Sequence, residues 1–329
     1  MKGLFDNFGR QHTYLRISIT ERCNLRCRYC MPPEGIELKE KSEILNFDEI
    51  ERLATMFVRL GIRKIRVTGG EPLVRRDVEQ LCKRLASIPG VETLAISTNA
   101  VLLEEKAQAL FDAGVTHINI SLDTLRAERF KHITIRNEFD AVLRGIEKAL
   151  QLGFPSVKVN TVVMKGFNDD ELLDFVDFAK ALSLNHRFIE YMPFLGNGWN
   201  EVNVISYAEM KEIIQSKHTL IPIENNDGVP GPAKDFLVKG SEATIGFITT
   251  MTDHFCGDCN RLRLSSDGRL RNCLFSATTF DLKRMLRSGA SDDVIEDTIR
   301  MGVILKWEKH PESQELADMQ SNAMVAIGG

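Results

Sequence analysis

The chain reads YLRISITERCNLRCRYC over residues 14–30. The first seven residues alternate between polar or aromatic and aliphatic side chains, which is the two-residue period of a β-strand. Three cysteines follow at once, Cys23, Cys27 and Cys30, with the spacing C-x3-C-x2-C. We therefore expect a strand over residues 14–20, with the three thiols in the loop at its C-terminal end.

The same unit of strand, polar loop and helix recurs about six times between residues 14 and 192. The expected strands cover residues 14–20, 64–68, 94–98, 117–121, 157–163 and 188–192. A helical period of apolar residues fills the intervals, as over 47–58, where Asn46 can cap the start and Gly61 the end. Alternating strands and helices indicate an α/β fold with a parallel sheet. Six units instead of eight predict an incomplete (β/α)6 barrel of the TIM type over residues 1–205.

The rhythm changes after residue 205. We expect a helix over 207–214, a loop over 222–232 rich in Pro, Gly and Asn, and strands over 244–249 and 262–265. A hairpin turn over 265–268 and helices over 281–288 and 292–309 complete the pattern. Residues 206–329 are thus predicted to form an α+β region that closes the open side of the barrel.

The predicted strands each carry one polar face. Arg16, Ser18 and Thr20 share a face of the first strand, while Leu15 and Ile17 lie on the other. The same division separates Arg66, Thr68, Asn119, Ser121, Lys158 and Asn160 from their apolar neighbours. The apolar faces must meet the helices, so the polar faces line the interior. Few acidic residues share these faces, which argues against internal salt bridges and favours a large anionic ligand.

The composition narrows the classes of partner. Forty-two Lys and Arg against 46 Asp and Glu give a net charge of −4, which does not predict binding to nucleic acid or to an anionic membrane. No apolar stretch reaches the length of a membrane span, and residues 1–6 lack the apolar segment of a signal peptide. We expect a cytoplasmic chain, where seven cysteines indicate metal binding instead of disulfides. Cys82 lies in an amphipathic helical pattern and is predicted to be a core residue.

A second cysteine triad lies near the other end of the chain. Cys256, Cys259 and Cys273 have the spacing C-x2-C-x13-C. Each triad is one ligand short of the four that a zinc ion or a cubane iron–sulfur cluster takes, so each metal site would keep an open position. Zinc is the alternative, but its usual spacing pairs a C-x2-4-C with a second pair downstream.

The first triad, with Tyr29 before its third cysteine, resembles the signature of the radical S-adenosylmethionine (SAM) superfamily. The segment Thr68-Gly-Gly-Glu-Pro72, at the end of the second strand, is similar to the second motif of that superfamily. The resemblance implies a [4Fe–4S] cluster on Cys23, Cys27 and Cys30, with SAM on the fourth iron and Glu71 near its ammonium group. It also implies that SAM contacts Tyr29, Gly70, Ser121, Arg187 and Met192.

The second triad, together with Asn260-Arg-Leu-Arg263, resembles the C-terminal motif of the GTP 3′,8-cyclases, the family of molybdenum cofactor biosynthesis protein A. The resemblance extends over most of the chain, including Val157-Lys-Val-Asn160, Leu264-Ser-Ser-Asp-Gly268 and the terminal Gly328-Gly329. It implies a second [4Fe–4S] cluster whose free iron takes the purine of GTP. It implies GTP contacts from Arg16, Arg66, Ser97, Lys158, Arg261 and Arg263. Ser97 stands where the family has Thr and keeps the hydroxyl.

The implied reaction starts with reductive cleavage of SAM at the first cluster. The resulting 5′-deoxyadenosyl radical would take the C3′ hydrogen of GTP, and attack on C8 would give (8S)-3′,8-cyclo-7,8-dihydroguanosine 5′-triphosphate. The resemblance assigns catalytic roles to Cys23, Cys27, Cys30, Arg261 and Arg263. It also implies an electron donor such as a flavodoxin or ferredoxin, a homodimer, and a Gly328-Gly329 tail that reaches the catalytic cavity.

The residues themselves support a nucleotide held by side chains. The chain has no G-x-x-x-x-G-K-[ST] segment, so a P-loop is excluded. Arg261 and Arg263 alternate with two leucines, so both guanidinium groups face one way. Two alternatives stay open: a radical SAM enzyme of the peptide-maturase type, which usually has more C-terminal cysteines, and a non-catalytic iron–sulfur or zinc protein.

Overall fold

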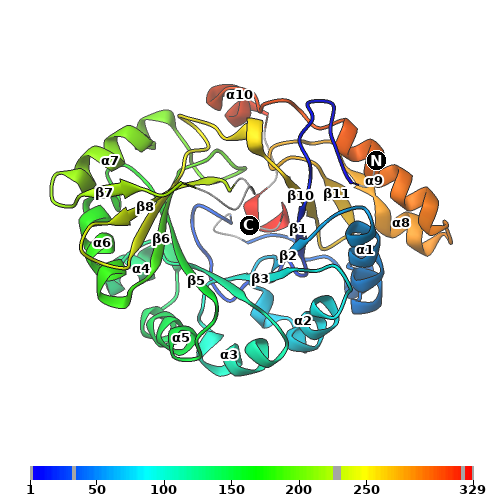
Figure 1. Ribbon diagram of the computed structural model, residues 1–329, viewed down its shortest axis with the longest axis horizontal. Coiled ribbons are helices and arrows are strands. Elements are labelled where there is room, and N and C mark those ends of the chain that lie inside the picture. The colour runs from blue at the N-terminus through cyan, green and yellow to red at the C-terminus, as the bar shows by residue number, and fades with distance from the viewer. Residues whose placement is uncertain (1–2, 32–34, 225–230, 320–322, 328–329) are drawn as a thin grey trace.

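The computed structural model describes residues 3–31, 35–224, 231–319 and 323–327, and these form one curved twelve-stranded sheet with helices on its outer side (Figure 1). The strand order is β12-β11-β10-β1-β2-β3-β4-β5-β6-β9-β8-β7. The strands are β1 (Tyr14–Ser18), β2 (Lys64–Thr68), β3 (Thr93–Thr98), β4 (His117–Ser121), β5 (Ser156–Val163), β6 (Asn185–Glu190), β7 (Leu220–Pro222), β8 (Ala233–Val238), β9 (Thr244–Ile248), β10 (Arg261–Leu264), β11 (Arg269–Arg271) and β12 (Phe280–Asp281).

The six strands β1 to β6 pair in parallel, each with the next along the chain. This confirms the prediction of an α/β incomplete barrel. The later strands lengthen both edges: β10 pairs in parallel with β1, and β9 pairs in parallel with β6. Antiparallel partners follow at each edge, so the sheet stays open among the described residues.

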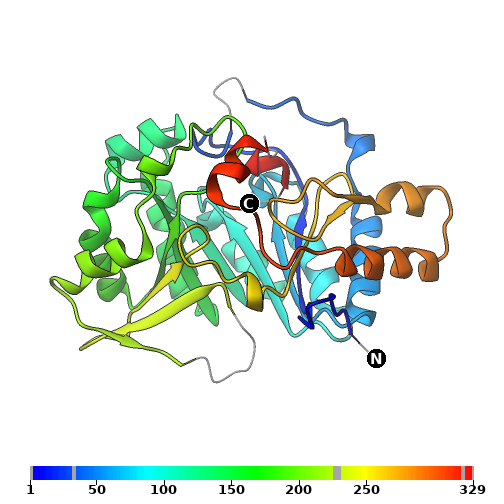
Figure 2. The same ribbon diagram turned by 90° about the horizontal axis from the view of Figure 1, so that it is seen from above.

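The helices cover the convex side of the sheet and its ends. They are α1 (Phe47–Arg59), α2 (Val78–Ala86), α3 (Leu103–Asp112), α4 (Ala127–Thr134), α5 (Phe139–Gln151), α6 (Leu172–Leu182), α7 (Tyr207–Gln215), α8 (Leu282–Arg287), α9 (Asp292–Ile304), α10 (Ser313–Asp318) and α11 (Met324–Ile327). The Asn46 side chain accepts from the Glu49 N–H, as expected for the cap of α1, and Gly61 follows with φ +112°. Figures 1 and 2 show α11 on the concave side, near the middle of the barrel.

The two predicted boundaries that differ most from the structure do so for reasons of tertiary structure. The last strand of the six begins at Asn185 instead of residue 188, because His186 is fully buried against the ring of Phe175. Helix α9 ends at Ile304 instead of residue 309. There Lys306 turns inward and donates to the Arg261 carbonyl at 2.9 Å. Residues 225–230 of the expected loop lie outside the described residues.

Alternate residues of β1 face the helices and the barrel interior, as predicted. Leu15 and Ile17 are fully buried under the outer helices, and Arg16 lies on the other face. Parallel register then places Arg16 opposite Arg263 on one neighbouring strand and opposite Arg66 on the other. Side chains of one face that are in register across neighbouring strands lie side by side, so these three arginines form one inner row.

Candidate functional site

The first cysteine triad lies in the loop after β1, at the C-terminal mouth of the barrel. The Leu25 N–H points at the Cys23 sulfur at 3.4 Å, and the Cys30 N–H donates to the Cys27 carbonyl at 2.9 Å. Burial raises the pKa of Cys27 well above its usual value and that of Cys30 to about 12, and the charges of neighbouring cysteines add to both shifts. Thiolates this close together are stable only beside positive charge, so the donor set fits an iron–sulfur cluster.

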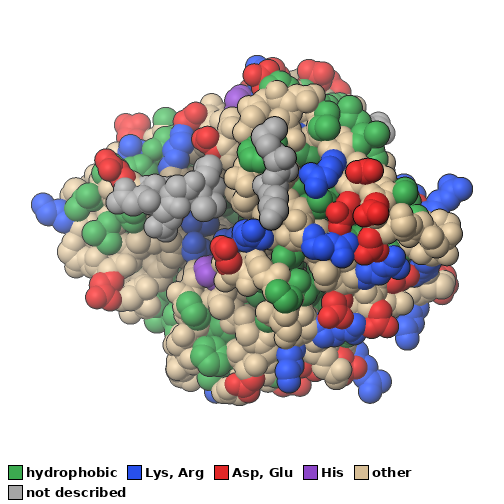
Figure 3. Space-filling view, turned by 45° about the vertical axis from the view of Figure 1, so that its right-hand side comes forward, with side chains coloured by type: hydrophobic (Ala, Val, Ile, Leu, Met, Phe, Trp, Pro, Cys, Tyr) green, Lys and Arg blue, Asp and Glu red, His purple; other side chains and the backbone are tan. Residues whose placement is uncertain are grey.

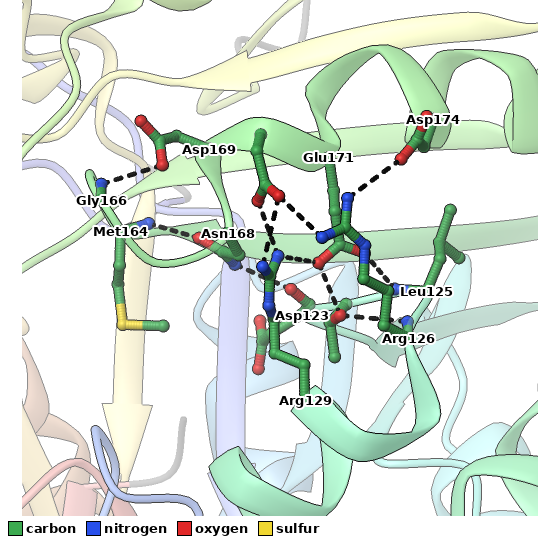
Figure 4. Close-up of polar contacts among 12 residues, drawn as sticks. Asp123, Leu125, Arg126, Arg129, Met164, Gly166, Asn168, Asp169, Glu171 and Asp174 are labelled. Atoms are coloured by element: carbon green, nitrogen blue, oxygen red, sulfur yellow. Dashed lines mark hydrogen bonds and ion pairs between the residues drawn. The ribbon is translucent and has the colours of Figure 1, made fainter.

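Tyr29 ties this loop to the end of β4. Its hydroxyl donates to the Asp123 carboxylate at 2.7 Å. The other carboxylate oxygen of Asp123 accepts from the Val162 N–H at 2.9 Å, and its carbonyl accepts from the Asn168 amide at 2.7 Å (Figure 4). Tyr29, the residue directly before Cys30, is thus held through Asp123 by contacts from Val162 of β5 and from Asn168. Neither Asp123 nor Asn168 was predicted from the sequence to have a role.

A buried carboxylate, that of Glu171, holds the residues that follow Asp123 (Figure 4). Glu171 is fully buried and accepts from the Thr124 hydroxyl and the Leu125 N–H, both at 2.6 Å. It also pairs with Arg129 of α4, which in turn pairs with Asp170 at 2.6 Å. The N–H groups of residues 26 and 28 in the cysteine loop donate to backbone carbonyls at the end of α4. The ion pairs that hold α4 therefore also stabilise the cysteine loop.

The Gly-Gly-Glu segment packs against the cysteine loop. A Cβ atom on Gly69 would lie 2.4 Å from the Thr20 carbonyl oxygen, and one on Gly70 would lie 2.5 Å from that of Arg22. The glycines are therefore needed for contact between the two loops, a role the sequence did not indicate. Glu71 is buried and accepts from the Thr98 hydroxyl and the Asn99 N–H, and burial raises its pKa to about 7.

Four interior positions expected to contact GTP lie on β1, β2, β3 and β5. Arg66 is buried, its guanidinium lies 3.3 Å from the Ser97 hydroxyl, and Asn119 accepts from it at 2.8 Å when the amide oxygen faces it. Register places Asn119 opposite both Ser97 and Lys158. Burial, reinforced by nearby cations, lowers the pKa of Lys158 to about 7. Burial likewise lowers the pKa of Arg16, with Arg263 as the largest charge nearby.

Several interior polar atoms have no hydrogen-bond partner among the described residues. They are the Tyr14 hydroxyl, Nε of Arg66, the side-chain oxygens of Asn160 and Asn185, and Nε of Arg187. Buried polar groups are almost always paired, so this set indicates an interior that receives a polar ligand. By contrast, acidic and basic side chains are interspersed on the outer surface (Figure 3).

The second triad lies at the opposite end of the barrel, since Cys259 precedes β10 and Cys273 follows the antiparallel β11. Burial raises the pKa of Cys259, but Arg261 and Lys306 reverse this and lower it to about 6. The N-terminal Arg10 donates to the Cys256 carbonyl at 2.6 Å and so joins the triad to the segment before β1. Arg10 and Lys306 were not among the predicted site residues.

The remaining predicted residues have different surroundings. Ser121 is exposed at the end of β4, and Met192 packs against the cluster around Phe194. Arg187 pairs with Asp235 of β8 at 2.8 Å, an acidic partner that the expected strands did not include. Gly328 and Gly329 lie outside the described residues.

The C-terminal segment before these glycines lies beside the first triad. Val325 is buried with Met31 and Ala323 against Cys23 and Cys30. A backbone hydrogen bond from Val325 partly offsets the upward pKa shift of Cys30. The end of the chain therefore contributes to the mouth of the barrel.

Within residues 3–31, 35–224, 231–319 and 323–327, no three His, Cys, Asp or Glu side chains gather closely enough to hold one metal ion. The two ligand sets therefore stay predictions.

Comparison with known proteins agrees with this geometry. Residues 17–179 match the model of the radical SAM superfamily, and residues 184–312 match that of Molybdenum Cofactor Synthesis C. The mitochondrial GTP 3′,8-cyclase of Arabidopsis thaliana is 46% identical over 99% of this chain and 83% of its own length. The GTP 3′,8-cyclase of Thermodesulfovibrio yellowstonii is 45% identical over 98% of this chain and 99% of its own length. The chain belongs to the GTP 3′,8-cyclase family.

This family assignment brings a [4Fe–4S] cluster and SAM with it, as in the radical SAM superfamily generally. The chain spans about half the length of some relatives, such as the mouse molybdenum cofactor biosynthesis protein 1, which is 46% identical over 99% of this chain and 51% of its own.

Streptococcus suis SuiB, in its complex with the precursor peptide SuiA, has a fold similar to that of this chain. The TM-score is 0.63 at 15% identity, over 98% of this chain and 76% of the other. In the described part of the chain, no helix has both the length and the apolar character to cross a bilayer.

Proposed function

We propose that this chain is a GTP 3′,8-cyclase that converts GTP to (8S)-3′,8-cyclo-7,8-dihydroguanosine 5′-triphosphate, the first step of molybdenum cofactor synthesis. One observation carries the proposal. A row of inward cations, Arg263, Arg16 and Arg66, crosses the barrel between two cysteine triads at its opposite ends. Arginine suits phosphate oxygens in charge and geometry, so this row of cations would receive the triphosphate of GTP.

The proposed cofactor residues fall into two groups by position. At the mouth, Cys23, Cys27 and Cys30 would hold the first cluster, and Tyr29, Gly70, Glu71, Ser121, Arg187 and Met192 would hold SAM. When bound, these groups supply the reductive radical chemistry. The protein contributes a loop that Asp123 and Glu171 keep in place.

At the other end, Cys256, Cys259 and Cys273 would hold a second [4Fe–4S] cluster. Arg261 and Arg263 lie on the strand that starts beside Cys259, and Ser97 and Lys158 lie across the interior. In this arrangement the guanine would meet the second cluster while the phosphates meet the cations. The low pKa of Cys259, which results from Arg261 and Lys306, favours the thiolate that a metal requires.

Anaerobic incubation with a reductant, SAM and GTP tests the activity directly. We expect 5′-deoxyadenosine and the cyclised nucleotide to form together, and neither to form when GTP is replaced by ATP. If the wild-type protein, with its iron in place, cleaves no SAM in the presence of GTP, the proposed function is wrong.

The Cys273→Ala variant tests the second cluster. We expect iron to fall from about eight to about four atoms per chain and cyclisation to be lost, because one of two cubane clusters loses a ligand. Cys82→Ala removes a thiol from the outer core and should change neither. Full iron and full activity in Cys273→Ala would refute the role of the second triad.

We also propose the division into a catalytic barrel over residues 1–205 and a C-terminal region over 206–329. A flavodoxin or ferredoxin as electron donor and a homodimeric state are further proposals that rest on the family resemblance. A cytoplasmic location is a proposal that rests on the sequence of residues 1–6 and on the cysteine content. Native mass spectrometry of the anaerobic protein would test the dimer, and a single-chain mass at micromolar concentration would contradict it.

A further inference from the structure

Tyr14 occupies the floor of the cationic interior. It is the first residue of β1, and register places it opposite Arg261 on β10 and Lys64 on β2. It lies on the same face of β1 as Arg16, two residues on, and its side chain therefore faces the interior. Its ring lies 5.2 Å from the Lys64 ammonium and 5.5 Å from the Arg66 guanidinium, measured to the ring centroid.

The hydroxyl of Tyr14 has no hydrogen-bond partner among the described residues, although the residue is only 8% exposed. A buried phenol without a partner lowers stability, so such a group usually has a ligand or a functional reason. Tyr14 is also absent from the apolar cluster between the sheet and the helices, to which Leu15 and Ile17 belong. Its neighbours are cations, and its position is therefore not explained by packing.

The electrostatic surroundings make this hydroxyl a strong donor to an anion. Burial raises the pKa of Tyr14, but the charges of Arg66, Arg16, Lys64 and Arg261 outweigh burial and lower it. The same positive potential that favours loss of the proton favours its donation to a negatively charged oxygen. Lys64 and Arg66, which lie over the ring, have long side chains that can move with an incoming phosphate group.

We propose that the Tyr14 hydroxyl donates a hydrogen bond to a phosphate oxygen of the bound nucleoside triphosphate. This makes Tyr14 a further substrate-binding residue of the proposed GTP site, and the inference rests on that proposed function. The alternative positions for the hydroxyl, against the base or the ribose, are less consistent with four surrounding cations.

The Tyr14→Phe variant removes only the oxygen. In equilibrium dialysis with the anaerobically purified holoenzyme, we expect GTP to bind about 10-fold or more weakly than to wild type, since a hydrogen bond to a charged group is lost. Guanosine, which has no phosphate, should bind equally well to both proteins. Tyr207→Phe removes a hydroxyl from α7, outside the interior, and should bind GTP like wild type.

The outcomes separate the two proposals. If wild type binds GTP and Tyr14→Phe binds it equally well, or if guanosine is weakened as much as GTP, the role of Tyr14 is wrong while the proposed function stands. If wild type does not bind GTP, both are wrong. Thermal unfolding without nucleotide gives a second measurement: we expect the melting temperature of Tyr14→Phe to equal or exceed that of wild type. A clear decrease would reveal a protein partner for the hydroxyl and overturn the inference.

Discussion

GTP binding should be accompanied by uptake of a proton by Lys158. This residue lies on the inner face of β5, opposite Asn119 and Asn185. Burial lowers its pKa to about 7, and the charges of Arg187, Lys64 and Arg66 add to the shift while Asp235 opposes it. His117, which faces the same cations, has a pKa of about 4 through burial and stays neutral above pH 6.

The magnitude follows from the difference between the free and bound pKa of Lys158. At pH 8 a pKa of about 7 leaves only about a tenth of the free side chains charged. A phosphate beside the ammonium would return the pKa toward its ordinary value of about 10.4, so binding should take up about 0.9 proton at pH 8 and little at pH 6. The bound pKa is the higher one, so affinity is full below pH 7 and falls about tenfold per unit as pH rises above it.

Calorimetry of GTP binding in two buffers with different ionisation enthalpies measures this proton uptake. GTP itself titrates in this range, so the control is Lys158→Arg, which keeps a positive charge at every pH used. We expect wild type to take up close to one proton more than the variant at pH 8. Equal uptake by the two proteins would show that Lys158 is already charged in the free barrel, and the reasoning would fail.

Two further substitutions test the supports of the cysteine loop. In Glu171→Ala the lost carboxylate leaves buried donors unpaired, and we expect urea unfolding to show a loss of about 3–5 kcal/mol. The exposed Asp174→Ala should change stability by less than about 0.5 kcal/mol. In Gly70→Ala the new Cβ would lie 2.5 Å from the Arg22 carbonyl oxygen, so we expect iron to fall to about half. Gly231→Ala, with open space around it, should keep all its iron, and equal iron in both variants would contradict the steric argument.

The inner faces of the strands could be predicted because strand side chains alternate with a period of two. Residues 64–68 and 117–121 were correct at both ends, and Arg16, Arg66 and Lys158 do face the interior. The apolar face of each strand has to pack against the helices, so the residues that alternate with it must face the interior. The alternation involves only residues of one strand, so it can be recognised in the sequence.

Features that depend on which strands become neighbours were not predictable. The pairing of β10 with β1 brings Arg263 beside Arg16, and the pairing of β8 with β9 brings Asp235 to Arg187. Strand β8 was not expected at all, because it follows a loop and its alternation is short. The contacts of Tyr29 with Asp123 likewise join segments that are 94 residues apart.

Strand β1 lies between the two cysteine triads. Its C-terminal end leads to Cys23, and its N-terminal residue Tyr14 lies beside Asn260, next to Cys259. The five residues of the strand therefore separate the two cysteine groups by about 13 Å or more. In the proposed function, neither cluster alone would reach both ends of the bound GTP. A nucleoside triphosphate has a base, a sugar and a phosphate chain in line, so it can meet one group with its base and present its ribose toward the other. In the proposed function, the inner cations would then fix where the nucleotide lies along the barrel, so that selectivity would depend on the position of the positive charge more than on its total.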